Sequence, residues 1–253
     1  AHKQARNVPD KTANSIILGT WNIANLGAQK RDAEHHELIS EILGWFDVVA
    51  VQECRDNFGP LFDILHYLGK DYKVVMSDAS GNDERMVMIY DARKLRLLEE
   101  IGEIAFPVAD LKNVKLKGVK QKFQGFDRTP YLTSFELTKQ LSILVINVHL
   151  YFGSDKKEAR ERRALETAAV ARWATKRRKS EFSFAREVVA ICDFNMPKPA
   201  ADGGNVVYDA LTSKGLVLPG HSSEIGSSIA SDNHYDQVAI FPETSKNCVV
   251  DTG

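Results

Sequence analysis

The chain has 253 residues, of which 43% are hydrophobic and 26% are charged, and its formal net charge is -1. The length fits one large α/β domain or two small ones, and the composition is ordinary for a soluble globular protein. A net charge so close to zero argues against tight, non-specific binding of nucleic acid. The sequence contains no internal repeat and no apolar run near the ~20 residues of a membrane-spanning helix, so no membrane span is expected.

The apolar pattern predicts an alternation of strands and helices. Predicted strands cover residues 15–20, 48–51, 72–76, 86–90, 94–104, 131–137, 141–150, 188–191 and 235–241. Predicted helices cover residues 33–45, 58–68, 156–179 and 207–213. Strands separated by helices, with some strands adjacent in the sequence, predict an α/β domain with one mixed sheet or two packed sheets.

The N-terminal residues 1–14 are polar and lack the apolar core of a signal peptide, so we expect a tail before a single domain of residues 15–253. Because the sequence begins with alanine, a leader could have been removed, and both a cytoplasmic and an exported location stay open. Cys54, Cys192 and Cys248 show no zinc-binding spacing, and the first two end apolar strands, where buried free thiols are expected. No feature indicates a protein partner, and we expect a monomer.

Two segments are rich in lysine and arginine. The first, residues 112–128, contains one acid, Asp127, and is expected to attract phosphates. In the second, residues 156–179, glutamates alternate with the basic residues at helical spacing, which predicts a solvent-exposed helix face.

Polar residues that can carry chemistry stand near the ends of several predicted strands. The run of residues 188–191 leads into Cys192-Asp193-Phe194-Asn195, where a carboxylate and an amide two positions apart can reach one site. Taken alone, each of these residues could have a purely structural role, as a turn residue, a surface acid or a histidine in the core. The repetition of the pattern favours a site. The residues concerned are Asn22, Glu53, Glu84, Arg128, His149, Asp193, Asn195 and Asp236.

This set of side chains supplies what the hydrolysis of a phosphoester requires. Carboxylate and amide oxygens are natural ligands of a hard divalent ion that neutralises the phosphate. A carboxylate can take a proton from the attacking water, while imidazole and guanidinium groups hold the phosphate oxygens. The set contains no thiolate cluster and no Ser/His nucleophile pattern.

Five short motifs, in this order, resemble the endonuclease/exonuclease/phosphatase superfamily, which has the DNase I-like fold. They are Thr20-Trp21-Asn22, Val51-Gln52-Glu53, Asn147-Val148-His149-Leu150, Asp193-Phe194-Asn195 and Tyr235-Asp236-Gln237-Val238. The match covers roughly residues 15–245, and the chain most resembles bacterial members of unassigned substrate. The resemblance implies an α+β, four-layer α-β-β-α sandwich of two mixed sheets, with the site at one edge where strand ends meet.

The resemblance also implies roles in binding metal and activating water. Glu53 would ligate Mg²⁺ or Mn²⁺, with Asn22 beside it as a further ligand of the metal or of the phosphate. Asp193 would orient and deprotonate the attacking water. Asn195 would position that water or the phosphate.

Further roles concern the phosphate and the acid–base groups. His149 would bind the scissile phosphate, and Glu84 would orient His149. Arg128, in the sequence Arg-Thr-Pro-Tyr, resembles an arginine that contacts the phosphate. Asp236 resembles an aspartate that pairs with an essential histidine.

The chain departs from the family pattern in two places. Cys192 replaces a glycine, which is expected to have little effect in a buried strand. A Ser-Asp-His motif on the family's final strand, whose histidine would pair with Asp236, is missing. Residues 231–234, Ser-Asp-Asn-His, are expected to form the loop before the last predicted strand, and we expect the C-terminal strand to be absent from this sequence.

The expected function is therefore divalent-metal-dependent hydrolysis of phosphoesters. A nuclease or other phosphodiesterase is the first hypothesis, with DNA or RNA among the candidate substrates. The alternatives are a phosphomonoesterase or lipid-type phosphodiesterase of the same fold, or a non-catalytic binding module if the terminal motif is truly absent.

Overall fold

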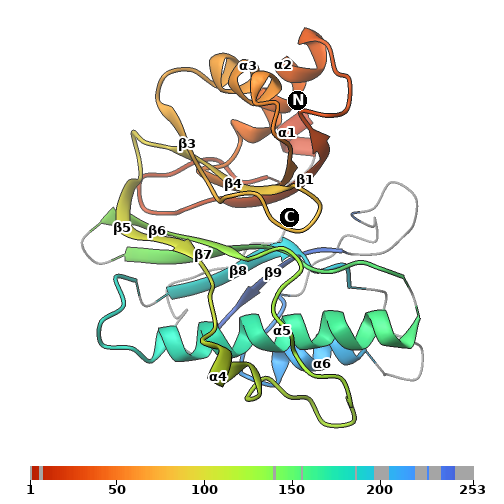
Figure 1. Ribbon diagram of the computed structural model, residues 1–253. Helices are drawn as coiled ribbons and strands as arrows, with labels where there is room; N and C mark the ends of the chain where they lie inside the picture. Colours follow the sequence, from red (N-terminus) through yellow and green to blue (C-terminus); the bar gives the residue numbers. More distant parts are fainter. Residues whose placement is uncertain are drawn as a thin grey trace.

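The computed structural model describes residues 2–5, 8–138, 141–154, 156–185, 187–196, 205–219, 227 and 235–242. Two β-sheets lie face to face, and helices cover the outer side of each sheet, which makes four layers (Figure 1). This arrangement confirms the predicted sandwich of two mixed sheets.

Each sheet is built from one half of the chain. The first sheet and its helices comprise β1 (Leu18–Leu26), α2 (Ala33–Leu43), β2 (Val48–Cys54), α3 (Gly59–Leu68), β3 (Tyr72–Met76) and β4 (Arg85–Asp91). The second comprises β5 (Arg96–Glu103), β6 (Tyr131–Thr138), β7 (Leu141–His149), α5 (Lys157–Arg178), β8 (Glu187–Asp193), α6 (Val206–Thr212) and β9 (Asp236–Ile240). Two one-turn helices, α1 (His2–Ala5) and α4 (Val108–Leu111), escape prediction because a single turn shows no apolar period.

The strand order is β1-β2-β4-β3 in the first sheet and β5-β6-β7-β8-β9 in the second. The pairs β1–β2 and β7–β8 are parallel, and the other pairs are antiparallel. The carboxyl ends of β2, β7 and β8 meet at one edge of the two sheets, which we call the site edge.

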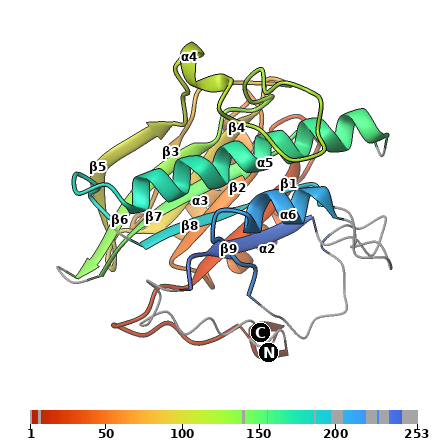
Figure 2. The ribbon, with the colours of Figure 1, turned by 90° about the horizontal axis from the view of Figure 1, so that it is seen from below.

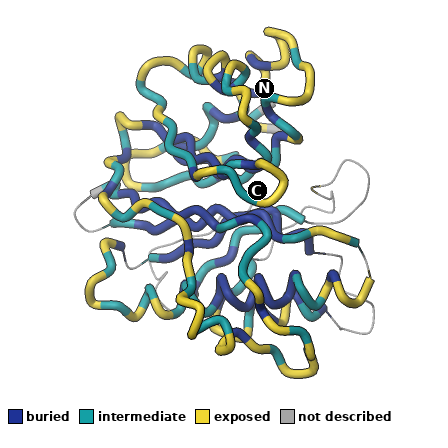
Figure 3. The backbone as a smooth tube through the Cα atoms, viewed as in Figure 1, coloured by how far each residue is buried: buried dark blue, intermediate teal, exposed yellow. Residues whose placement is uncertain are grey.

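Strand alternation builds the apolar layers between these elements. In β2, Val48 and Ala50 pack with the second sheet, whereas Val49 and Val51 pack with α2 and α3. A third apolar cluster joins the second sheet to α5 and α6. The central strands and the inner side of α5 are accordingly buried (Figure 3).

Helix α5 has the solvent-exposed charged side that its spacing predicts, with Lys157, Glu158 and Arg160 exposed, but two other charged residues of this helix face inward. Viewed from below, it lies along the second sheet beside α6 (Figure 2). Arg163 is 1% exposed and Glu166 is fully buried. These charges point inward because neighbouring loops present backbone groups that need partners, as the site shows below.

A buried pair of amide side chains joins the two sheets. Gln52 Nε2 donates to Asn147 Oδ1 over 2.6 Å, and Asn147 Nδ2 donates to the carbonyls of Val51 and Val87 over 3.1 and 3.0 Å. Because these residues come one or two positions before Glu53 and His149, the bridge fixes how the two sheets align at the site edge.

Other expectations were met or corrected locally. Cys54 and Cys192 are buried free thiols, as predicted, whereas Cys248 and residues 231–234 lie outside the described residues. Strand β1 runs past the predicted end at residue 20, because its pairing with β2 continues across an irregularity between Asn22 and Leu26. Within the part of the chain that the structure describes, no helix is long and apolar enough to cross a membrane.

Candidate active site

The topology explains why residues far apart in sequence meet at the site edge. Strands β7 and β8 end there with His149 and Asp193, and Glu53 is the last residue but one of β2. Strands β4 and β9 run antiparallel to β2 and β8, so they begin there, next to Glu84 and at Asp236. In the register, Asp193 lies between His149 of β7 and Asp236 of β9.

Glu53 owes its orientation to an irregular strand end. The pairing of β2 with β4 shifts between Val51 and Cys54, and Glu53 has a φ of 60°. Its Oε1 accepts from Asn22 Nδ2 over 2.8 Å, and its Oε2 accepts from the Asn25 backbone N–H over 2.9 Å. Asn22 Nδ2 also lies 3.1 Å from Asp193 Oδ2, so this amide links carboxylates of the two sheets.

Asp193 is held by the turn that follows β8. Its Oδ1 accepts from the Asn195 backbone N–H over 2.9 Å. Asn195 has a φ of 47°, a conformation that asparagine tolerates better than most residues, and its Nδ2 donates to the Leu150 carbonyl over 2.8 Å. Asp193 Oδ2 lies 3.8 Å from His149 Nε2.

His149 is backed by a buried ion-pair network. Its Nδ1 lies 3.0 Å from Glu84 Oε2, which also accepts from Arg128 Nε over 2.6 Å. Arg55 Nη2 lies 3.2 Å from Glu84 Oε1. Burial raises the pKa of Glu84, but the close contact with His149 and the hydrogen bonds from Arg128 outweigh it and lower this pKa to about 2. Glu84 is thus a fixed negative charge behind the imidazole, and His149 Nε2 faces Glu53 Oε1 at 3.9 Å.

Asp236 lies beside Asp193 with little compensation for its charge. Its Oδ1 is buried and has no hydrogen-bond partner in the described part of the chain. Burial and the neighbouring charge of Asp193 raise the pKa of Asp236 to about 7. This carboxyl therefore stays protonated to a higher pH than an exposed aspartate does.

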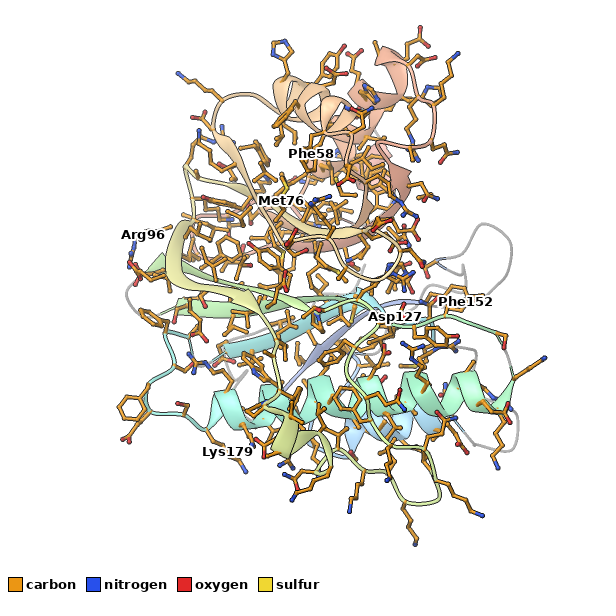
Figure 4. All side chains as sticks on the ribbon, in the orientation of Figure 1. Phe58, Met76, Arg96, Asp127, Phe152 and Lys179 are labelled. Atoms are coloured by element: carbon orange, nitrogen blue, oxygen red, sulfur yellow. The ribbon has the colours of Figure 1, made fainter. Side chains whose placement is uncertain are left out.

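A cavity of about 510 Å³ opens beside these groups. Asp127 and Phe152 lie together at this end of the molecule, whereas Arg96 lies at the opposite end (Figure 4). The residues that line the cavity are Asn25, Glu53, Arg55, Asn82, Glu84, Asp127, Arg128, His149, Tyr151, Phe152, Gly153, Asp193 and Asn195.

The buried charges of α5 hold two of the cavity walls. Glu166 accepts from the backbone N–H groups of Asp127 and Tyr151 over 3.1 and 3.0 Å. Arg163 donates to the carbonyls of Tyr151 and Phe152. The loops that carry Asp127 and Phe152 are therefore tied to one rigid helix.

Sequence reasoning missed several residues of this cavity, of which Arg55 is the most central. Its Nη2 donates to Asn25 Oδ1 over 2.7 Å as well as contacting Glu84. Arg55 stands two positions after Glu53, so a charged residue just beyond a strand end was the available signal. Tyr151 and Phe152 likewise stand two and three positions after His149, but only the fold shows that they line the cavity.

The residues at the site edge fit a hard divalent cation. Glu53, Glu84 and His149 offer ligand atoms within 4.8 Å of one another. The oxygens of Glu84 are already engaged by arginine, so Glu53 and Asp193, whose carboxylates both contact Asn22, are the better oxygen donors. Asn22 presents its amide nitrogen to them, because its Oδ1 accepts from the Ala24 N–H over 3.0 Å.

Comparison with known proteins shows strong structural likeness at low sequence identity. A mannosyl-6-phosphatase from Bacteroides thetaiotaomicron is 18% identical over 90% of this chain and 86% of that one, with a TM-score of 0.60. A truncated TDP2 from Caenorhabditis elegans is 15% identical over 89% of this chain and 83% of that one, with a TM-score of 0.58. The human Nocturnin catalytic domain with a bound sulfate is 14% identical over 92% and 85%, with a TM-score of 0.57.

No family model and no curated protein sequence matches the chain. The structural likeness nevertheless extends over nearly the whole length of the proteins compared, one of which is described as an endonuclease/exonuclease/phosphatase family protein from Bacteroides thetaiotaomicron, with 16% identity, coverage of 90% and 83%, and a TM-score of 0.55. The chain therefore shares the fold of these proteins, which confirms the DNase I-like sandwich that the resemblance of its motifs implies.

Proposed function

We propose that this protein is a divalent-metal-dependent phosphoester hydrolase that uses Asp193 to activate water. One observation carries the proposal. His149 Nε2 lies 3.9 Å from a carboxylate oxygen of Glu53, on the other sheet, and 3.8 Å from one of Asp193, and all three residues line one cavity. A purely structural cluster would be packed closed, whereas this one is open to a ligand.

The proposed roles follow from the contacts. Glu53 and Asp193 would hold the cation, which when bound neutralises phosphate charge. Asp193 has one oxygen fixed by the Asn195 N–H, and its other oxygen, which contacts Asn22 Nδ2 over 3.1 Å, would accept the proton from water. His149 Nε2 and the guanidinium of Arg128, which lines the cavity, would donate to phosphate oxygens, and Glu84 would keep both in place.

Two substrate classes remain as candidates. The first is a phosphodiester, as in a nuclease. The second, a small phosphomonoester, is favoured by the charge of the cavity, which is lined by Glu53, Glu84, Asp127 and Asp193 against only two arginines. Among the described lining residues, which also include His149, that balance suits a compact substrate with its cation better than a long polyanion, and the mannosyl-6-phosphatase among the similar structures acts on such a class by its description.

The test is hydrolysis by the full-length protein after removal of metal with EDTA and addition of Mg²⁺ or Mn²⁺. Substrates would be a bis-aryl phosphodiester, an aryl phosphomonoester, hexose phosphates, oligonucleotides and plasmid DNA. We expect turnover only with metal, and Asp193→Asn to lower kcat about 10²–10⁴-fold while the protein stays folded. Asp209→Asn, an exposed acid on α6, is the matched control and should retain activity. Wild-type turnover by Asp193→Asn would refute the assigned mechanism.

A further inference from the structure

A second, smaller cavity of about 200 Å³ lies on the helical side of the second sheet. It is formed by the segment that follows α4, by the middle of α5 and by the end of α6, and that segment runs alongside α5 (Figure 2). Its lining shares no residue with the cavity at the site edge. Lys115 and Lys117 belong to the basic segment of residues 112–128, of which the proposed hydrolysis uses Arg128 but none of the lysines.

The charge of this cavity has one sign. Lys115, Lys117, Arg172 and Lys214 line it, and no acid is among its described lining residues. Arg172 Nε is buried and has no hydrogen-bond partner in the described part of the chain. A buried guanidinium nitrogen without an acceptor is unfavourable, so an anionic oxygen that accepted from it would be stabilised.

The cavity walls are held by the fold. Val114 is 3% exposed and packs into the core cluster under α5, with Leu116 packed against the same cluster. The lysines at 115 and 117 alternate with these anchors. On the other side, Thr175 of α5 donates to the Lys214 carbonyl over 3.1 Å.

We infer that this cavity binds a small phosphate-type oxyanion, at a site separate from the one proposed for hydrolysis. A guanidinium and three ammonium groups match the several oxygens of such an ion. The volume lies below the ~300–1,000 Å³ of ordinary small-molecule pockets, which favours inorganic phosphate or the phosphate end of a small monoester over a larger ligand.

The test is a titration of the full-length, ¹⁵N-labelled protein in EDTA, followed by NMR at constant ionic strength. Inorganic phosphate and glycerol 3-phosphate are the two probes, and chloride is the ionic-strength control. We expect saturable shifts of the amides of residues 113–117 and 213–214 with one or both probes, and the tighter probe identifies the source of the phosphate group. Because no metal or turnover is needed, the outcome is independent of the proposed hydrolysis.

Arg172→Gln should weaken this binding at least about tenfold, which corresponds to one lost charged hydrogen bond. Arg160→Gln, an exposed arginine of the same helix outside the cavity, is the matched control and should bind as the wild type does. If Arg172→Gln does not fold, Lys214→Gln at the exposed rim should also weaken binding. Equal affinity in the cavity variant and in Arg160→Gln, or shifts confined to the site edge, would overturn the inference.

Discussion

At the scale of single residues, the role of each carboxylate in the site depends on which groups donate hydrogen bonds to it. Glu84 is committed to Arg128, Arg55 and His149, and these contacts leave it a permanent anion. Glu53 and Asp193 are held through Asn22 and backbone N–H groups, which position their oxygens without neutralising them. Glu84 therefore holds His149 in place, whereas Glu53 and Asp193 have oxygens that can bind a cation.

Glu53→Gln tests this division of roles. The substitution keeps the size of the side chain but removes the charge, so Mg²⁺ affinity should fall at least about tenfold, while the unfolding free energy changes little. Isothermal titration calorimetry measures the affinity. Glu41→Gln, an exposed glutamate of α2, is the control. Unchanged Mg²⁺ affinity in Glu53→Gln would remove this residue from the metal site.

At the scale of the elements, α5 and β7 contribute more than packing. Glu166 of α5 accepts hydrogen bonds from two wall loops, but burial still raises its pKa from 4.5 to about 7. Asn147 of β7 makes three hydrogen bonds to the first sheet in the buried interface. Glu166 therefore connects α5 to the cavity walls in a way that depends on pH, and Asn147 connects β7 to the first sheet next to the site edge.

The raised pKa of Glu166 sets the sign of a pH effect. As the pH rises above 4.5 the unfolded chain loses this proton first, while the folded protein keeps it until about pH 7, so the unfolding free energy should fall across this interval. In Glu166→Gln that part of the decline should disappear, although one backbone hydrogen bond is lost. Urea denaturation from pH 4.5 to 8 measures both effects, with the exposed Glu158→Gln as control. An identical pH slope in wild type and Glu166→Gln would contradict the assignment.

Asn147→Ala should destabilise the protein by about 2–4 kcal/mol, because it leaves the Gln52 amide and two buried carbonyls without partners. Any phosphoesterase activity should fall as well, since the bridge aligns Glu53 with His149. Chemical denaturation and kcat are the readouts. Ser142 lies on the same strand, and its side-chain hydrogen bond is exposed to solvent. The control variant Ser142→Ala should therefore lower the unfolding free energy far less. A loss no larger than that of the control would show that the bridge is dispensable.

At the scale of the whole molecule, the two sheets should unfold as one unit. The layer between them contains side chains from both, and Phe135 at its centre is fully buried against the Tyr90 ring, with 5.1 Å between the ring centroids. Neither sheet can lose this layer without exposing the apolar face of the other.

Phe135→Ala should therefore lower the unfolding free energy by about 3–5 kcal/mol while retaining a single transition. Denaturation followed by far-ultraviolet circular dichroism and by tryptophan fluorescence checks that the two probes coincide. Phe62 on α3 is 57% exposed, so the control variant Phe62→Ala should change the unfolding free energy little. Two separate transitions would mean that the sheets fold independently.

The order of strands and helices, and most of the site edge, could be predicted from the sequence because both are local properties. Short continuous apolar runs mark β2, β7 and β8, and the polar residues Glu53, His149 and Asp193 stand where these runs stop. The order of these strand ends resembles the motif order of a known superfamily, and this resemblance implied that the ends meet.

Only the tertiary structure decided which charges face inward and what surrounds the strand ends. The spacing of charges on α5 could not reveal that Arg163 and Glu166 are buried, because the backbone groups that they satisfy belong to loops distant in sequence. Arg55 and Phe152 became cavity residues, and Arg172 became an unpaired buried donor, for the same reason. Local pattern shows which residues can be buried or reactive, whereas their partners come from long-range packing that no local pattern encodes.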